Sequence, residues 1–283
     1  MTADPRLTPA RPDLAAAHLK GTVEAERFVE PVPHVVGVPV APMAGRPDGT
    51  AAMGTQLLFG ERVEVYEAEG QWAWGQAVAD GYVGYVPRPC LERAEGAPAP
   101  THRIAPPMSH LYPIPDMKRP PECWLSGASR VAVSGTAEAG FLPLASGGWV
   151  PEAHLAALDA PATDWVAEAE RFLGLPYLWG GRSGMGVDCS GLVQLALAAA
   201  GRDCPRDSDL QEARLGRDLA AETPLMRGDL VFWKGHVGVM TDGATLLHAN
   251  AHHMAVVAEP LDTATGRIAG AGGGGVTRRA RLA

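Results

Sequence analysis

The stretch that decides this fold is residues 176–194, which read Pro-Tyr-Leu-Trp-Gly-Gly-Arg-Ser-Gly-Met-Gly-Val-Asp-Cys-Ser-Gly-Leu-Val-Gln. A glycine-rich loop leads into Asp188-Cys189, and an alanine- and leucine-rich run then continues to Gly201. That run predicts a buried helix with a glycine C-cap. Cys189 then lies in the first turn, where unpaired N–H groups and the helix dipole favour a thiolate. A helical cysteine is more often an inert core residue, but the preceding glycines, which let a substrate backbone approach, favour a nucleophile.

The composition is that of an ordinary globular protein. The 283 residues suffice for two or three domains, and 46% of them are apolar and 20% charged. The net charge of −8 argues against nucleic acid or an anionic membrane as a partner. No apolar run approaches the ~20 residues needed to cross a bilayer. Neither nucleic acid nor a membrane is therefore expected as a partner, and the chain is expected to be a monomer.

The N-terminus and the cysteines predict a cytoplasmic protein. The first nine residues contain Asp4 and two prolines, and no apolar core follows, which does not fit a secretory signal. The four cysteines show no C-x-x-C spacing, which favours free thiols in a reducing compartment. An exported chain that had lost its signal would share these features.

Shifts in composition divide the chain into an arm, two β segments and a mixed C-terminal segment, expected at residues 1–30, 31–96, 97–160 and 161–283. The arm is expected to contain a short helix over 14–20. The first β segment has five short apolar runs separated by turn signals such as Asp80-Gly81, which predict a small barrel. Residues 56–61, the tryptophan-containing run after them and residues 80–87 together resemble bacterial SH3-like domains, and the resemblance covers the whole segment.

The second β segment follows a proline-rich linker and repeats one feature of the first. Trp149-Val150-Pro151 echoes Tyr85-Val86-Pro87, and a leucine follows each of them four residues later. This favours a second SH3-like barrel over an unrelated β segment.

The C-terminal segment mixes helices with strands. Helices are expected over about 163–173, from Cys189, and over 208–215. Four successive strands are expected over 229–233, 236–240, 245–249 and 255–259, joined by turns such as Asp242-Gly243. An antiparallel sheet behind packed helices is an α+β domain.

Two histidines on neighbouring strands complete the chemistry that Cys189 requires. A cysteine nucleophile needs a base that takes and returns its proton, and a third group that orients the base. The Asp242-Gly243 hairpin places His236 and His248 side by side on one sheet face. His236 is therefore the expected base, with His248 behind it.

The motifs around these residues are similar to those of the NlpC-type bacterial cell-wall cysteine peptidases. The matching stretches, in order, are 176–181, 188–194, 205–211, 227–233, 236–239 and 248–249. The resemblance implies a papain-like core in which Cys189 is the nucleophile, His236 the general base and acid, and His248 the orienting residue. It also implies hydrolysis of the γ-D-glutamyl–diamino-acid bond of peptidoglycan peptides. Together with the two β segments, it gives the expected fold class: two all-β SH3-like barrels followed by an α+β papain-like peptidase domain.

Two SH3-like modules ahead of such a core resemble the subgroup that trims murein peptides with a free N-terminal L-Ala. The resemblance implies that the first module closes one end of the cleft, and that D-Glu and the L-Ala ammonium are held by Asp188, Ser190, Asp207 and Ser208. Glu61 and Tyr82 are candidates from the first barrel, because a buried ammonium needs a carboxylate and other acceptors. Tyr177 and Trp179 are expected to form an aromatic wall, with Tyr177 donating to the developing oxyanion.

Simpler roles remain open for several of these residues. Asp188 can merely cap the helix, Glu61 can be a solvated strand end, and Tyr82 and Trp179 can be core aromatics. His252-His253 lacks the three or four converging ligands of a zinc site, so neither metal nor cofactor is expected. Two rival functions also remain: a secreted hydrolase of intact cell wall, and a binding protein with an inactive cleft.

Overall fold

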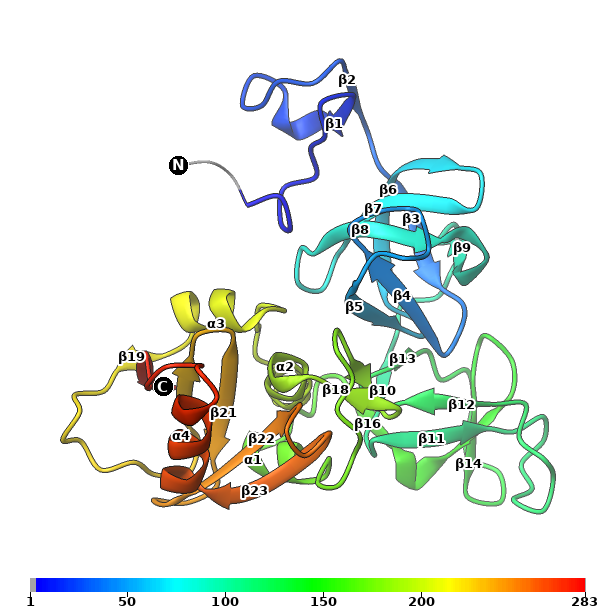
Figure 1. Cartoon of the computed structure of the whole chain (residues 1–283). Coiled ribbons are helices and arrows are strands. Elements are labelled where there is room, and N and C mark those ends of the chain that lie inside the picture. The colour runs from blue at the N-terminus through cyan, green and yellow to red at the C-terminus, as the bar shows by residue number, and fades with distance from the viewer. Residues whose placement is uncertain (1–3, 283) are drawn as a thin grey trace. The chain divides into compact units, whose positions relative to one another are not determined.

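The computed structural model describes residues 4–282, and its contacts divide the chain after Leu158 into an N-terminal and a C-terminal unit. Figure 1 shows the N-terminal unit in blue to green and the C-terminal unit in green to red. The N-terminal unit is built almost entirely of strands, whereas the C-terminal unit combines strands with α-helices.

The arm at the start of the N-terminal unit is extended rather than helical. Strand β1 (Leu14–Ala16) pairs in parallel with β2 (Arg27–Val29), and only a single 3₁₀ turn, η1 (Ala17–Leu19), follows β1. The short helix expected over 14–20 is therefore limited to the 3₁₀ turn at Ala17–Leu19, and residues 14–16 form a strand instead. Leu14, Ala15 and Ala16 are fully buried, so packing overrides the helical preference of leucine and alanine.

A seven-stranded antiparallel sheet follows, in the order β5-β4-β8-β7-β6-β3-β9. Its strands are β3 (Val32–Val36), β4 (Val40–Ala44), β5 (Met53–Leu58), β6 (Arg62–Glu69), β7 (Trp72–Ala77), β8 (Val83–Pro87) and β9 (Leu91–Arg93). Asp80-Gly81 lies in the turn between β7 and β8, as predicted. The first of the five apolar runs, residues 35–40, does not form one strand as the sequence suggests, because the chain leaves the sheet after Val36 and re-enters it at Val40.

The second β segment has shorter strands and its own core of Ile104, Leu125, Val131, Leu144 and Val150. Its elements are β10 (His102–Ile104), β11 (Met108–Leu111), β12 (Cys123–Ser126), β13 (Arg130–Val131), β14 (Phe141–Pro143), β15 (Trp149–Pro151), η3 (Glu152–His154) and β16 (Leu155–Ala157). Here β10 pairs with β13 and β16, β11 with β12, and β14 with β15.

The two echoing sequences fold in the same way. Strand β8 runs into the 3₁₀ turn η2 (Arg88–Cys90) and then β9, just as β15 runs into η3 and then β16. A proline precedes each turn and a leucine in extended conformation follows each one. The assignment of the second segment as an SH3-like barrel stays a prediction.

A six-stranded antiparallel sheet forms the centre of the C-terminal unit, in the order β19-β24-β20-β21-β22-β23. The strands are β19 (Arg217–Asp218), β20 (Asp229–Trp233), β21 (His236–Met240), β22 (Thr245–Asn250), β23 (Ala255–Pro260) and β24 (Arg278–Arg281). The helices are α1 (Trp165–Glu170), α2 (Cys189–Ala199), α3 (Ser208–Arg214) and α4 (Leu261–Gly270), and a small hairpin, β17 (Arg182–Ser183) with β18 (Gly186–Val187), precedes α2.

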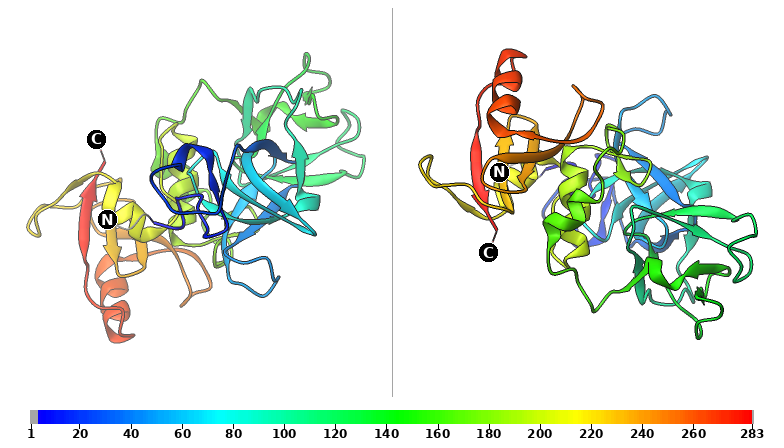
Figure 2. Two further views of the ribbon diagram at one scale, coloured as in Figure 1. Left: turned by 90° about the horizontal axis from the view of Figure 1, so that it is seen from above. Right: turned by 90° about the horizontal axis from the view of Figure 1, so that it is seen from below.

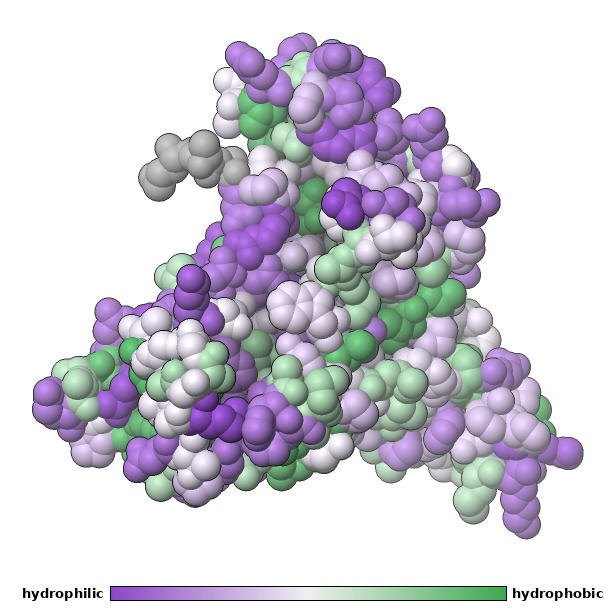
Figure 3. Space-filling view, viewed as in Figure 1, coloured by the Kyte–Doolittle hydropathy of each residue, from purple (hydrophilic) through white to green (hydrophobic). Residues whose placement is uncertain are grey.

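The end of the chain holds two elements that the sequence analysis did not anticipate. Helix α4 follows β23 and packs Ala264 against Val231, Trp233 and Leu246 of the sheet. Strand β24 then returns to pair with β20, and Figure 2 shows α4 and β24 in red beside the yellow and orange strands. On the face seen in Figure 3, the surface of the C-terminal unit is a mosaic of hydrophilic and hydrophobic residues.

Candidate active site

Cys189 is the first residue of α2, as the sequence predicts. The Asp188 side chain caps the helix by accepting from the N–H of Gly191 at 2.7 Å. The thiol is buried, with a residue exposure of 8%, and the backbone N–H groups of Val237 and Ser190 hydrogen-bond to it. Because Val237 follows His236 in β21, the nucleophile lies against the strand that carries the expected base.

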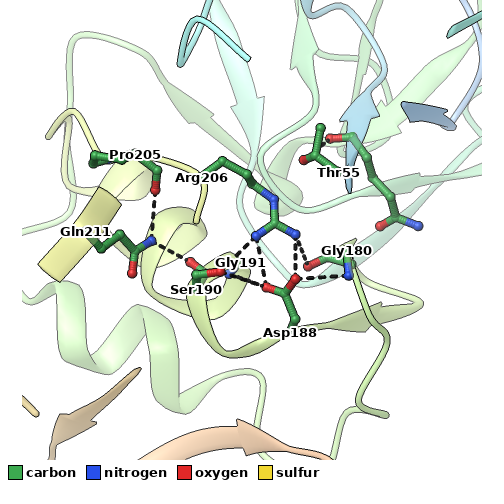
Figure 4. Close-up of polar contacts among 10 residues, drawn as sticks. Thr55, Gly180, Asp188, Ser190, Gly191, Pro205, Arg206 and Gln211 are labelled. Atoms are coloured by element: carbon green, nitrogen blue, oxygen red, sulfur yellow. Dashed lines mark hydrogen bonds and ion pairs between the residues drawn. The ribbon is translucent and has the colours of Figure 1, made fainter. Parts of the chain in front are cut away.

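A buried arginine clamps the start of this helix (Figure 4). Arg206 Nη1 lies 2.9 Å from Asp188 Oδ1, and Nη2 lies 2.7 Å from Oδ2, which is the bidentate geometry of a strong ion pair. Arg206 also donates to the Ser190 hydroxyl and to the Gly181 carbonyl. Asp188 is thus more than a helix cap, because it joins the glycine-rich loop, the helix and the segment before α3.

Gln211 connects α3 to the first turn of α2 by hydrogen bonds. Its Nε2 donates to the carbonyls of Ser190 and Pro205, both at 2.9 Å. Gln211 is fully buried, and Figure 4 shows its side chain lying between these two carbonyls. The backbone immediately after the nucleophile is therefore held by a side chain from another helix.

The two histidines lie on one face of the sheet and form a hydrogen-bonded pair. His236 Nε2 is 2.8 Å from His248 Nδ1, with ring centroids 5.0 Å apart. Gly238 lies two residues after His236 on β21, and a Cβ there would come within 2.7 Å of Leu246 and 3.2 Å of His248. The missing side chain of Gly238 therefore makes room for the pair.

His248 is itself held by residues that the sequence analysis did not select. Its Nε2 is 2.8 Å from Glu259 Oε1 and 3.0 Å from Asn250 Nδ2, and Arg267 of α4 forms an ion pair with Glu259. Glu259 lies on β23, in a register that a single sequence does not reveal. The available signal was a carboxylate near the end of a short apolar run, and many strands end in this way.

Burial keeps the nucleophile and the histidines neutral. Burial and the Asp188 charge raise the pKa of the Cys189 thiol to about 12, against the opposing effect of the Val237 N–H. Burial, with the neighbouring His248 and Arg267, lowers the pKa of His236 to about 3. Burial also lowers the pKa of His248, although Glu259 opposes that shift. The resting site is thus a thiol with a neutral imidazole on the neighbouring strand, and the expected thiolate is wrong because burial outweighs the effect of the helix N-terminus.

The two expected aromatic residues differ in exposure. Tyr177 is half-buried, and burial together with the nearby Cys189 and Asp188 raises its pKa to about 12, so its hydroxyl remains a donor at neutral pH. Trp179 is 68% exposed, which contradicts a core role for its ring. Both lie in the loop before Cys189, and their assignment to the substrate wall stays a prediction.

The remaining predicted binding residues lie in both units. Asp207 is the N-cap residue of α3 and directly follows Arg206, and Ser208 is the first residue of the helix. Glu61 and Tyr82 belong to the N-terminal unit. Glu61 is only 4% exposed and accepts from the Leu58 N–H, so it is not a solvated strand end. The assignment of all four to substrate binding stays a prediction.

Within residues 4–282, no group of three or more histidine, cysteine, aspartate or glutamate side chains is arranged to hold a metal ion. His252 and His253 stack edge to face, with their ring centroids 4.7 Å apart. No helix of the described part of the chain is long and apolar enough to span a membrane.

The arrangement can carry out acyl transfer. A buried thiol at a helix N-terminus, an imidazole beside it and a second imidazole orienting the first are the parts of a cysteine peptidase site. His236 Nε2 is engaged with His248, which leaves His236 Nδ1 as the nitrogen able to take the thiol proton.

Comparisons with known proteins agree with this chemistry. The sequence model described as the NlpC/P60 family matches residues 174–266, and that described as the bacterial dipeptidyl-peptidase Sh3 domain matches residues 44–89. The chain is 30% identical over 223 residues to the gamma-D-glutamyl-L-lysine dipeptidyl-peptidase of Bacillus subtilis, covering 69% of this chain and 71% of that protein. The enzyme of the same name from Bacillus cereus is 29% identical over 238 residues, covering 74% and 71%.

Among solved structures, an NlpC/P60 family protein from Bacillus cereus matches with a TM-score of 0.75 and 23% sequence identity, covering 88% of this chain and 99% of that one. An NlpC/P60 endopeptidase from Photobacterium damselae subsp. piscicida matches with a TM-score of 0.61 and 14% identity, covering 93% and 74%. These likenesses support the fold. With an SH3-like domain ahead of a peptidase domain, and Cys189 at the head of its central helix, the chain belongs to the NlpC/P60 family of peptidoglycan-hydrolysing cysteine peptidases.

Proposed function

We propose that this peptidase hydrolyses the γ-D-glutamyl–diamino-acid bond of murein peptides with a free N-terminal L-Ala, and releases L-Ala-γ-D-Glu. The observation that carries the proposal is the hydrogen bond between His236 and His248, with His236 on the strand that borders the Cys189 thiol. The substrate class is supported by the name of the two Bacillus relatives, which are aligned over about two thirds or more of this chain.

In the proposed reaction, His236 Nδ1 takes the Cys189 proton as the sulfur attacks the γ-carbonyl carbon of D-Glu. The tetrahedral intermediate collapses by breaking the C–N bond, and His236 returns the proton to the leaving amine of the diamino acid. Water then attacks the acyl-thioester, His236 takes a proton from it, and the thiol is restored as the γ-carboxylate leaves. Tyr177 is the proposed donor to the oxyanion.

The resting state sets a requirement on this reaction. Because burial raises the pKa of Cys189 and lowers that of His236, proton transfer between them is uphill in the free enzyme. In the proposed reaction, proton transfer to His236 therefore accompanies the attack of the sulfur rather than preceding it. The hydrogen bonds from Val237 and Ser190 N–H groups favour the thiolate once it forms.

The test is product analysis by mass spectrometry on three peptides. They are L-Ala-γ-D-Glu-meso-diaminopimelate, its N-acetylated twin, and the same peptide with L-Lys as its third residue. We expect L-Ala-γ-D-Glu from the free-amine peptides alone, and no product from the Cys189→Ala variant. Equal cleavage of the N-acetylated peptide would favour the rival function, hydrolysis of intact wall, in which that amine is blocked.

The proposal also includes a cytoplasmic location, where free murein peptides would be recycled. The four cysteines are thiols rather than disulfides, which fits a reducing compartment. Immunodetection in separated cytoplasmic, wall and culture-supernatant fractions tests this part. Recovery of the protein in the wall or supernatant fraction would contradict it.

A further inference from the structure

The ring of His248 is completely buried, and both of its nitrogens have polar neighbours. Nδ1 faces His236 Nε2, whereas Nε2 faces two groups at once, Glu259 Oε1 at 2.8 Å and Asn250 Nδ2 at 3.0 Å. A neutral imidazole carries one N–H, so its two nitrogens cannot both donate. Whether Nε2 carries the proton therefore decides whether Nδ1 donates or accepts a hydrogen bond.

Hydrogen bonds to Glu259 and to Asn250 require different tautomers of His248. A carboxylate only accepts, so a bond to Glu259 requires the proton on Nε2. The Asn250 Nδ2 group only donates, so a bond to it requires a bare Nε2. The orientation of the Asn250 amide is fixed from its other side, because its Oδ1 accepts the N–H of His253 at 2.9 Å. The two neighbours therefore compete for one nitrogen.

The tautomer of His248 in turn sets the tautomer of His236, the proposed catalytic base. With the proton on Nε2, His248 Nδ1 accepts from His236 Nε2–H, and His236 Nδ1 keeps the lone pair needed to take the thiol proton. With Nε2 bare, His248 Nδ1–H donates to His236 Nε2, which forces the His236 proton onto Nδ1. In that second state His236 has no free nitrogen with which to act as a base.

The charges around the ring favour Glu259. Partial burial alone would favour a neutral acid, but the His248 hydrogen bond and Arg267 outweigh it and lower the pKa of Glu259. A hydrogen bond to an ionised acceptor is about twice as strong as a neutral one. The charged or titratable groups acting on His248 are Glu259 on β23, Arg267 on α4, His253 in the loop before β23, and the paired His236 on β21.

We propose that Glu259 is a positioning residue that fixes the tautomer of His248, and through it that of His236, against the competing amide of Asn250. The inference rests on the proposed roles of Cys189, His236 and His248, and extends them by one residue. Arg267 supports it by keeping the Glu259 carboxylate charged and in place.

The test uses variants of the full chain that remove or move the carboxylate. Glu259→Gln is isosteric and leaves a neutral acceptor, Glu259→Leu leaves none, and Glu259→Leu with Asn250→Asp places a carboxylate on the other neighbour of Nε2. The aspartate introduced by Asn250→Asp can still accept the His253 N–H. Asp229→Asn is the matched control, because it weakens an ion pair with Arg281 elsewhere on the same sheet.

We expect kcat to fall in the order parent, Glu259→Gln, Glu259→Leu, with a loss of about 10²-fold in the last, the lower range of what a positioned base contributes. KM should stay within about twofold of the parent's. The double variant should regain about tenfold in kcat over Glu259→Leu, and Asp229→Asn should keep the parental kcat. Parental kcat in both Glu259→Gln and Glu259→Leu would overturn the proposal, as would a loss that Asn250→Asp does not relieve.

A second measurement needs no substrate and separates this proposal from the proposed function. In protein labelled with ¹⁵N-histidine, the nitrogen shifts of His248 report which nitrogen is protonated. We expect an Nε2–H tautomer in the parent and an Nδ1–H tautomer in Glu259→Leu. Because Glu259→Gln preserves shape, the same comparison can be made on it if the leucine variant does not fold. An unchanged tautomer in the variants would overturn the proposal even if the peptide is cleaved, and a changed tautomer would support it even if another substrate is the true one.

Discussion

Arg206 Nη2 lies 2.7 Å from Asp188 Oδ2, and the arginine side chain is completely buried. Asp188 directly precedes the nucleophile, so this ion pair sets the position of the first turn of α2. The guanidinium balances the Asp188 charge and fills the space between the glycine-rich loop and the segment before α3.

Removing one partner of this ion pair should lower the free energy of unfolding. Arg206→Met leaves the Asp188 carboxylate partly buried without its counter-charge, and such losses are about 3–5 kcal/mol in the free energy of unfolding. Urea unfolding of the full chain measures the change. The double variant Arg206→Met, Asp188→Asn should be more stable than Arg206→Met alone, because asparagine still caps the helix without a charge. A stability of Arg206→Met within about 0.5 kcal/mol of the parent would contradict this role.

The Cys189 thiol should be unreactive at neutral pH and gain reactivity with base. Its pKa is raised to about 12 by burial, so the thiolate fraction grows about tenfold for each pH unit between pH 7 and 10. Iodoacetamide labelling, followed on the Cys189 peptide by mass spectrometry, should rise accordingly. A rate that is flat between pH 6 and 9 would instead indicate a thiolate–imidazolium pair already present in the free enzyme.

The peptidase unit should lose stability in acid because its paired histidines are buried. The folded-state pKa of His236 is lowered from 6.5 to about 3, so below pH 6.5 the unfolded chain binds a proton that the folded chain does not. The free energy of unfolding should therefore fall as the pH drops from about 6.5 toward 3, by at most about 1.4 kcal/mol per pH unit for this histidine. His248 acts in the same direction.

Urea unfolding at several pH values between 4 and 7 measures this slope. His236→Gln removes one of the buried groups and should reduce it. If the parent and His236→Gln lose stability with the same slope, acid acts elsewhere in the chain.

Gly238→Ala should damage both packing and catalysis. The added Cβ would lie 2.7 Å from Leu246 Cδ1 and 3.2 Å from His248 Cβ, so the orienting histidine has to shift. Overpacking of this kind costs about 1–3 kcal/mol, and kcat should fall because the His236–His248 bond is disturbed. Gly266→Ala in α4 is the control: nothing lies within 4 Å of its Cβ, and alanine favours the helix. Equal kcat in the two variants would show that His248 tolerates the displacement.

Much of the C-terminal unit could be predicted because its signals are local. Asp164 caps α1 and Asp188 caps α2, each within three residues of the N–H groups it accepts. The strands of the His236–His248 hairpin lie within two residues of their expected bounds, because apolar runs and an Asp-Gly turn mark them. The histidine pair followed from that hairpin.

The parts that could not be predicted depend on contacts between distant segments. Strand β24 is recognised only by its pairing with β20, since its sequence Arg-Arg-Ala-Arg has little strand character. Helix α4 contains threonines and glycines of low helix propensity, and it is stabilised by packing Ala264 and Ile268 on the sheet. In the arm, burial of Leu14–Ala16 beside β2 overrides a helical preference.

The sequence by itself identified Cys189 as the expected nucleophile, His236 and His248 as its expected partners, and most of the helices and strands that carry them, because capping, periodicity and turn chemistry act over a few residues. Only the tertiary structure decided what surrounds those groups: Arg206 against Asp188, and Glu259 with Asn250 against His248. These contacts depend on strand register and loop path, which are fixed by the burial of apolar faces across the whole unit. The same burial shifts the pKa values of the thiol and the imidazoles. Local sequence signals therefore indicate which groups react, whereas the tertiary structure sets their protonation states.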